Sequence, residues 1–585
     1  MNEAATTAHS SGRRRPLLAR LFSRRTLLGS LFSKRPLYSF LCLRRPLLGL
    51  LVSLLACTLF LARAQDQPAE ELVGRLLLLA YSGTEAPLQR LREFEPAGFL
   101  FYPSNVPSTQ TARSVTQALQ EAADYPLLFG IDQEGGPFTT YRVDDATIFP
   151  GNMALAAAGD PELATEVARA TGQGLAYAGF NMNFAPVVDV NSHPDNPIIG
   201  IRSFGAHVAT VANLGQAYLA GLEEAGVTTV AKHFPGHGDT STDSHLSLPS
   251  VDGDRARLNA VELPPFEAMI EAGVPAIMTA HVAFPALEAD LPATLSPAAL
   301  TGLLRGELGF EGLIVTDYMD MAAIDARYGA GEAAVLSVLA GADMVLLGPD
   351  LEKQREVHAA LVEAVRTGRL SEERVREAVA RSRLVAERYR PRWDAPTPDY
   401  DAHRELAREV ATAGATLLWN DGVLPLEPAA EVLVVAPRPG LFGEPPHLGG
   451  VLARSHEVAL SLTVFSLTVS ERPSTAQIEE AVQMAETADV VVLGSYHWLG
   501  GFPDGLEELE ARLAATGKPL VVVALGNPDD LRFLPARPAA YLAVYGYREA
   551  NLQGAAALLT GAVQPTGRLP VPAGEFPMGA GMQDY

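Results

Sequence analysis

Cysteine is almost absent from this sequence. The chain of 585 residues contains two, Cys42 and Cys57, and both lie within the first 64 residues. If that stretch is removed, the rest of the chain has no disulfide, no thiol nucleophile and no thiolate metal ligand. Its chemistry must then come from histidines, carboxylates, hydroxyls or amines.

Basic residues are also scarce beyond residue 64. Residues 1–64 hold eleven of the 45 Lys and Arg and one of the 68 Asp and Glu, so residues 65–585 carry 34 basic and 67 acidic side chains. A protein this acidic repels phosphate backbones, which argues against nucleic acid as a partner. The length indicates two or three domains, and 48% apolar with 19% charged residues is typical of a globular protein rather than a disordered one.

The basic N-terminal stretch predicts an export signal. Arg44 and Arg45 precede an apolar run over 47–61, and the sequence ARA at 62–64 fits a small-x-small cleavage site. A cleaved signal predicts an exported protein, periplasmic, in the cell envelope or secreted, whereas a retained or lipid-bearing segment would anchor it to the membrane. Residues 14–53 repeat about every ten positions, so low-complexity sequence upstream of the true start codon is a third interpretation.

Short apolar runs alternate with longer amphipathic segments between about residues 70 and 390. Asp160-Pro161, an N-cap followed by a proline at the first helical position, predicts a helix to about residue 176. Eight such strand–helix units predict an N-terminal TIM (β/α)8-like barrel in preference to a doubly wound sheet. The predicted strands are 75–81, 98–102, 127–131, 181–188, 228–232, 276–279, 313–316 and 344–347.

A proline-rich segment at 391–400 predicts a domain boundary, because proline at this density cannot continue a helix. Apolar runs then recur with helical stretches between them, which predicts a C-terminal α/β sandwich domain over 401–585. This domain shows neither a phosphate-cradling glycine pattern nor an obvious catalytic pair, so we expect it to be structural. The predicted organisation is an extension at 1–64, a catalytic barrel at 65–390, a linker at 391–400 and the second domain. The predicted strands of that domain are 432–436, 459–469, 490–493, 520–525 and 541–544.

Polar side chains follow five of the predicted barrel strands. The carboxyl ends of the strands form the rim of a TIM barrel, where catalytic groups collect. Polar loops alone would explain one or two such positions, but not five. The residues are Asp132, Asp189, Lys232 with His233, His281, and Asp317. We therefore predict an active site at this rim.

The segment richest in chemistry is KHFPGHGDTSTDSHLSLP, which runs from Lys232 to Pro249. Its glycines permit unusual backbone angles, and its histidines and acids supply proton transfer. An acid/base loop is the favoured interpretation. A polar loop without chemistry and a zinc site are the alternatives, but nothing here resembles the helical i, i+4 histidine pair of zinc hydrolases. We expect neither a metal nor an organic cofactor.

Six segments make residues 70–585 resemble glycoside hydrolase family 3, in its β-N-acetylhexosaminidase branch. KHF occurs across the family, whereas the extension GDTxxDSH is specific to this branch. In the barrel the matching segments are IDQEGG (131–136), NFAPVVDVNSHPDNPIIGIRSFG (183–205), KHFPGHGDTSTDSH (232–245) and IVTDYMDM (314–321). In the second domain they are ATLLWNDGVLPL (415–426) and ALGNPDDLRFLP (524–535).

The resemblance implies a retaining β-N-acetylhexosaminidase that releases terminal GlcNAc from peptidoglycan fragments or chitin oligomers. Asp317 would be the nucleophile and His245 the acid/base, with Asp243 holding its imidazole. In an extended segment residues i and i+2 project to the same side, so Asp243 can reach His245 and raise its pKa. Asp320, three residues past the strand end, is the less favoured nucleophile.

Further roles carry over from the family to matching positions. The substrate-binding residues would be Asp132, Arg202, Lys232 and His233, and the supporting residues His237, Asp239 and His281. Arg202 could instead pair with Asp189 or Asp195, and Asp132 could instead cap a helix. One departure is Pro137, which follows IDQEGG where the family commonly carries arginine, so the contact to a second sugar there is in doubt.

Three other functions fit part of the pattern. A family 3 β-glucosidase shares KHF and the aspartate nucleophile, but lacks the Asp-Ser-His loop. A histidine acid/base also fits a β-N-acetylglucosaminide phosphorylase, because a histidine, unlike a carboxylate, would not repel an incoming phosphate dianion. An inactive carbohydrate-binding wall protein is the non-enzyme alternative. The expected partner is a GlcNAc-containing oligosaccharide or muropeptide, with membrane contact only through a retained N-terminus; the oligomeric state stays open.

Overall fold

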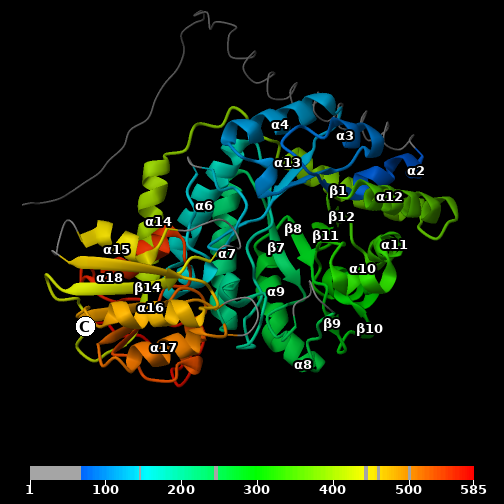
Figure 1. Ribbon diagram of the computed structural model, residues 1–585. Helices are drawn as coiled ribbons and strands as arrows, with labels where there is room; N and C mark the ends of the chain where they lie inside the picture. The colour runs from blue at the N-terminus through cyan, green and yellow to red at the C-terminus, as the bar shows by residue number, and fades with distance from the viewer. Residues whose placement is uncertain (1–67, 144–145, 243–247, 440–445, 457–461, 498–501) are drawn as a thin grey trace, which may run out of the picture. The chain divides into compact units, whose positions relative to one another are not determined.

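Eight parallel strands form the first sheet of the structure (Figure 1). The computed structural model describes residues 68–143, 146–242, 248–439, 446–456, 462–497 and 502–585. The strand order is β11-β8-β7-β6-β3-β2-β1-β12, and Val315 pairs with Met344 beside the two outer strands, so the sheet nearly closes into a barrel. The strands are β1 (Leu77–Ala80), β2 (Gly98–Phe101), β3 (Leu128–Ile131), β6 (Met182–Asn183), β7 (Thr228–Phe234), β8 (Ala276–Thr279), β11 (Leu313–Val315) and β12 (Val345–Leu347).

The predicted barrel is confirmed, but its fourth strand is shorter than predicted. β6 ends at Asn183, before Pro186, which has no N–H to donate to the ladder. Pairing resumes beyond it, where the Lys232 N–H donates to the Pro186 carbonyl at 3.2 Å and the Val188 N–H donates to the Lys232 carbonyl at 2.8 Å. Asp189, which follows Val188, therefore still lies at the carboxyl rim of the barrel.

Amphipathic helices surround the barrel, and apolar side chains such as Leu78, Met182 and Val230 fill its interior. A substrate can therefore bind only at a rim. The helix predicted from Asp160 is confirmed as α6 (Pro161–Ala178), and the Asp160 side chain accepts a bond from the Glu162 N–H. The other long helices are α4 (Thr109–Ala122), α7 (Val208–Ala225), α9 (Leu263–Glu271), α11 (Ala330–Ala340), α12 (Leu351–Arg366) and α13 (Glu372–Arg388).

A second sheet of six strands has the order β13-β18-β17-β16-β14-β15 and is parallel except for β13, which runs antiparallel to β18. The predicted α/β domain is confirmed, although β13 was not among its predicted strands. The strands are β13 (Thr416–Asn420), β14 (Glu431–Pro437), β15 (Thr463–Val469), β16 (Val490–Ser495), β17 (Leu520–Ala524) and β18 (Ala540–Ala543). Of the strand predicted over 459–469, residues 459–461 lie outside the described residues.

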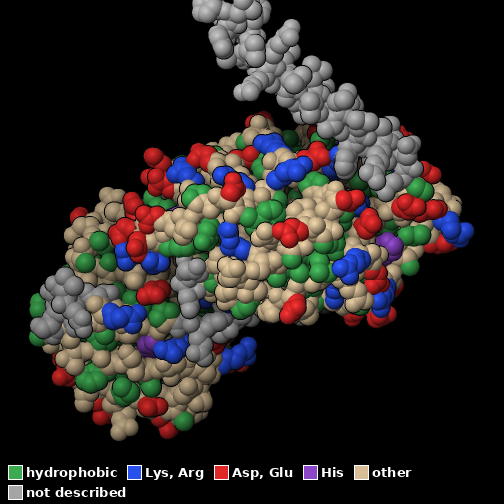
Figure 2. All heavy atoms as spheres, turned by 90° about the horizontal axis from the view of Figure 1, so that it is seen from above, with side chains coloured by type: hydrophobic (Ala, Val, Ile, Leu, Met, Phe, Trp, Pro, Cys, Tyr) green, Lys and Arg blue, Asp and Glu red, His purple; other side chains and the backbone are tan. Residues whose placement is uncertain are grey.

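The two sheets share apolar packing. Met153, Ala154 and Ile201 of the barrel domain belong to the same buried cluster as the strands of the second sheet. Helix α14 (Tyr400–Gly414) lies against α5 (Asn152–Ala158) and against α18 (Glu549–Leu559) of the second domain. On the face drawn in Figure 2, basic and acidic side chains are interspersed. Of the helices in the described ranges, none is both long and apolar enough to cross a membrane.

Candidate active site

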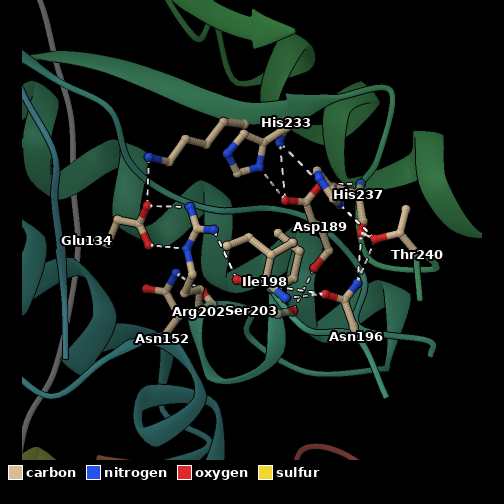
Figure 3. A network of polar contacts seen from close by, with 12 residues as sticks. Glu134, Asn152, Asp189, Asn196, Ile198, Arg202, Ser203, His233, His237 and Thr240 are labelled. Carbon is tan, nitrogen blue, oxygen red and sulfur yellow. Dashed lines mark hydrogen bonds and ion pairs between the residues drawn. The ribbon is translucent and has the colours of Figure 1, made fainter. Parts of the chain in front are cut away.

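A buried carboxylate, Glu134, holds two cationic side chains at the barrel rim (Figure 3). It lies in the short strand β4 (Gln133–Gly135), directly after β3. Arg202 Nε and Nη2 donate to its two oxygens at 2.9 and 2.8 Å, and Lys232 Nζ lies 2.7 Å from Oε1. Burial alone would raise the pKa of Glu134, but the two cations outweigh it and lower the pKa to about 2. Glu134 is therefore a permanent anion that fixes both cations.

Lys232 also binds Asp132, the first predicted substrate contact. Its Nζ lies 2.7 Å from Asp132 Oδ1, and the Asp132 side chain is 34% exposed while that of Lys232 is 3% exposed. The lysine is thus held between two carboxylates, and Asp132 retains an exposed part that can accept hydrogen bonds from sugar hydroxyls. Because Asp132 lies between β3 and β4, where no helix begins, the helix-cap interpretation is wrong.

Arg202 is engaged within the protein on all three nitrogens. Besides the fork on Glu134, its Nη1 donates to the Ile198 carbonyl at 3.1 Å, and the guanidinium lies 4.2 Å from the centre of the Phe138 ring. Its carboxylate partner is Glu134, so the alternative pairing with Asp189 or Asp195 is wrong. The predicted contact of Arg202 with a sugar stays a prediction.

Asp189 fixes His233, near the end of β7, and His237, which follows the strand. Its buried carboxylate lies 2.8 Å from His233 Nδ1 and accepts the His237 backbone N–H at 2.7 Å. Burial opposes the charge, but the nearby histidines outweigh it and lower the pKa of Asp189. Since Nδ1 of His233 faces Asp189, its Nε2 is the nitrogen left for a ligand.

The predicted supporting residues His237 and Asp239 face different neighbours. His237 Nδ1 lies 2.9 Å from Thr240 Oγ1. Burial, together with His233, lowers the pKa of His237 to about 4, so its ring is neutral at neutral pH. Asp239 accepts a bond from Ser192 Oγ at 3.1 Å and pairs with Arg257 at 2.9 Å. Asp239 therefore joins the segment after β7 to Ser192 and Arg257.

Asp317 lies two residues after the end of β11 and is half-buried. Its Oδ1 accepts the Tyr318 N–H at 2.7 Å. Burial would raise the pKa of this carboxyl, but the charges of His233, His281 and Lys232 lower it to about 2. The side chain is therefore an anion across the physiological range, as a carboxylate nucleophile requires.

His281 supports the backbone beside Asp317. Its buried ring lies 2.8 Å from Thr294 Oγ1 through Nδ1 and 3.1 Å from the Tyr318 carbonyl through Nε2. Both nitrogens thus have protein partners, which fits a positioning role.

Asp320 has the opposite electrostatic setting. Burial raises the pKa of its carboxyl. A Cβ on Gly348 would lie 2.2 Å from Asp320 Oδ2 and 2.0 Å from the Tyr318 hydroxyl, so the glycine makes room for both groups. The pKa of Asp320 is thus shifted in the direction opposite to that of Asp317, and the contrast favours Asp317 as the nucleophile.

Two family models match most of the chain. The glycosyl hydrolase family 3 N terminal domain matches residues 74–384, and the glycosyl hydrolase family 3 C-terminal domain matches residues 415–575. The chain belongs to glycosyl hydrolase family 3.

Relatives within family 3 carry names from one enzyme class. Beta-hexosaminidase A of Pseudoalteromonas piscicida is 38% identical over 375 residues, which are 59% of this chain and 62% of that protein. A beta-N-acetylglucosaminidase/beta-glucosidase of Cellulomonas fimi is 33% identical over 338 residues, 54% of this chain and 58% of that protein. The match thus spans less than two thirds of either relative.

A solved structure resembles the chain over nearly its own full length. The family 3 beta-N-acetylglucosaminidase from Paenibacillus sp. str. FPU-7 has a TM-score of 0.82 and 37% identity, and the match covers 87% of this chain and 99% of that one.

The predicted acid/base pair of this family 3 protein, Asp243 and His245, lies outside the described residues. Their roles stay predictions, as do those of the residues that the structure brings together: Asp132, Lys232, His233 and Asp317. Among the side chains that the structure places, no cluster of three or more His, Cys, Asp or Glu residues could hold a metal ion.

Sequence reasoning missed Glu134, although it lies inside the quoted IDQEGG segment. Its partner Arg202 is 68 residues away along the chain, so no local spacing marks the pair. The available signal was an acid placed directly after a barrel strand, the criterion that selected Asp132. Applied to both acids of the segment, it would have found Glu134 as well.

Proposed function

We propose that this protein is a retaining β-N-acetylhexosaminidase that releases terminal GlcNAc from peptidoglycan fragments or chitin oligomers. The observation that carries the proposal is the pair of groups at the rim: an ionised, half-buried Asp317 and a fixed cluster of Asp132, Lys232 and His233. An anionic nucleophile beside groups that hydrogen-bond hydroxyls is what glycosyl transfer to an enzyme requires. The names of the relatives and of the Paenibacillus structure support GlcNAc as the sugar.

In the proposed reaction Asp317 attacks the anomeric carbon and displaces the leaving oxygen. Asp132 accepts hydrogen bonds from hydroxyls of the terminal sugar, and Lys232 and His233 donate to them. His245, held by Asp243, protonates the leaving oxygen and then takes a proton from the water that releases the sugar. The mechanism uses no metal and no organic cofactor.

Export is part of the same proposal. The basic residues at 44–45, the apolar run at 47–61 and the small residues at 62–64 support a cleaved secretory signal. An exported enzyme would act on wall fragments during peptidoglycan turnover or on chitin outside the cell. A retained signal would keep the enzyme on the membrane surface.

One assay with purified residues 65–585 tests the activity. We expect 4-nitrophenyl β-GlcNAc to be cleaved much faster than the β-glucoside, at the same rate with and without phosphate, with free GlcNAc released first as the β-anomer. Preference for the glucoside would indicate a β-glucosidase. A phosphate-dependent sugar phosphate would indicate a phosphorylase, and binding of chitin oligomers without cleavage would indicate the inactive wall protein.

A further inference from the structure

An arginine of the second domain reaches a rim loop of the barrel. Arg532 lies in the short 3-10 segment η7 (Pro528–Phe533), after β17, and its Nη2 donates to Asp195 Oδ1 at 2.6 Å. On its own side Arg532 Nε is ion-paired with Asp529, which in turn accepts the Gly574 N–H at 2.7 Å. Contacts within the second domain thus hold the Arg532 guanidinium in the orientation that contacts the barrel.

The loop that Arg532 contacts, residues 192–196, is bonded to the histidine segment 237–240 (Figure 3). Asn196 Nδ2 donates to the His237 carbonyl at 2.9 Å and to Thr240 Oγ1 at 3.3 Å. The His193 N–H donates to the Gly238 carbonyl at 3.3 Å.

The chain just before this loop also approaches the histidine segment backbone to backbone. A Cβ on Gly238 would lie 1.8 Å from the Val190 carbonyl oxygen, so only glycine permits this approach. Since hydrogen bonds also join 192–196 to 237–240, we expect a displacement of the loop to displace the segment.

The histidine segment is continuous with the rim site. The His237 N–H and His233 Nδ1 share the Asp189 carboxylate, and the charge of His233 is the largest of those that lower the pKa of Asp317. A contact that fixes 237–240 therefore also fixes the histidine beside the proposed nucleophile.

We propose that Arg532 is a positioning residue for the histidine segment 237–240, acting through Asp195. The inference rests on the proposed function, because one of its readouts is turnover. It gives the second domain, which the sequence predicts to be structural only, a part in the geometry of the site. The Asp195 side chain is 58% exposed, and an exposed ion pair adds little to stability. We therefore expect loss of the Arg532–Asp195 pair to shift the segment 237–240 rather than to unfold the protein. Small shifts of groups at an active site can lower the catalytic rate considerably.

A double-mutant cycle of Arg532→Met and Asp195→Asn tests the proposal. Asp195→Asn leaves the Arg532–Asp529 pair in place, so it removes the Arg532–Asp195 ion pair without disturbing the second domain. We expect each single variant to lower kcat for 4-nitrophenyl β-GlcNAc about tenfold with little change in KM, and the double variant to be no slower than either. Arg532→Lys, which keeps the charge, should restore most of the rate.

Arg537→Met is the matched control. Arg537 lies 3.7 Å from Asp421 at the amino end of β18, away from the edge that carries Arg532. We expect kcat to stay within about twofold of the parent chain, as for a surface substitution without a role in the site.

Amide hydrogen exchange supplies a readout that does not depend on activity. We expect residues 190–196 and 236–240 to exchange faster in Arg532→Met and in Asp195→Asn, but not in Arg537→Met. Unchanged kcat and exchange in both variants, or a lowered melting temperature with unchanged kcat, would overturn the proposal. If the parent chain released no GlcNAc, the proposed function would fail while exchange would still decide whether Arg532 positions the segment.

Discussion

Glu134 is the residue on which the charged part of the rim depends. Its carboxylate, with a side chain 2% exposed, receives the Arg202 fork and the Lys232 ammonium. Removing one member of a buried ion pair leaves the remaining charges uncompensated. We therefore expect the Lys232 and Arg202 side chains both to shift when this one acid is neutralised.

The variant Glu134→Gln tests this dependence. We expect the free energy of unfolding to fall by about 3–5 kcal/mol, because buried Arg202 loses its counter-charge and buried Lys232 loses one of its two. Urea unfolding measures it, with Glu332→Gln as the control, since Glu332 pairs with Arg369 at an exposed site and should change stability by less than about 1 kcal/mol. A change of similar size in both variants would contradict the role of Glu134.

The pH dependence of the reaction distinguishes the histidines. Asp317 has a pKa of about 2 and His237 a pKa of about 4, so above about pH 5 the first stays ionised and the second stays neutral. Neither group can then produce a loss of activity at alkaline pH, which we assign to deprotonation of His245. In profiles of kcat/KM against pH, His237→Asn should keep the alkaline limb and His245→Ala should remove it. The reverse result would make His237 the acid.

At the scale of elements, strands whose signal is local could be predicted and those set by distant partners could not. All eight barrel strands follow from short apolar runs, but β6 is cut by Pro186 within its predicted run. β13 was not predicted, and its antiparallel pairing with β18 connects residues more than a hundred positions apart, which no local pattern shows. The same limit applies to the site: Asp132 and Asp317 follow from their places after strands, whereas the Arg532–Asp195 contact spans 337 residues.

Helix α17 (Leu506–Ala514) buries an acid that should make stability depend on pH. Burial raises the pKa of Glu510 to about 7, and only the Ala536 backbone offsets part of this effect. The pKa of a glutamate in the unfolded chain is about 4.3. The contribution of Glu510 to the free energy of unfolding is therefore largest below about pH 4 and is lost as pH rises through 7, by up to about 3 kcal/mol.

The variant Glu510→Gln should remove this dependence. We expect its melting temperature to exceed that of the parent chain by a few degrees at pH 8, with a smaller difference at pH 5, because the parent carboxyl is neutral there. The exposed neighbour Glu507→Gln on the same helix serves as the control and should show no such trend. An equal difference at both pH values would contradict the burial argument.

At the scale of the whole molecule, the barrel and the second domain are joined by a shared core. Met153, Ala154 and Ile201 pack into the cluster of the second sheet, and Arg548 donates to the carbonyls of Gly136 and Pro137 at 3.2 and 3.3 Å. Separating the domains would expose this apolar surface and break buried hydrogen bonds.

We therefore expect residues 65–585 to unfold in one calorimetric transition. Cooperative unfolding follows because barrel side chains complete the core of the second sheet, so melting one domain exposes apolar surface of the other. Two resolved transitions would contradict the shared core and would also weaken the case for positioning through Arg532.

In the proposed mechanism Asp317 forms a covalent bond with the sugar during turnover. A slow fluorinated GlcNAc donor with a good leaving group should accumulate the glycosyl-enzyme, because fluorine slows both its formation and its hydrolysis, whereas the activated leaving group speeds only its formation. Mass spectrometry of proteolytic peptides then locates the sugar. We expect one adduct, on Asp317; an adduct on Asp320, or turnover of the GlcNAc substrate with no adduct on any carboxylate, would rule out Asp317 as the nucleophile.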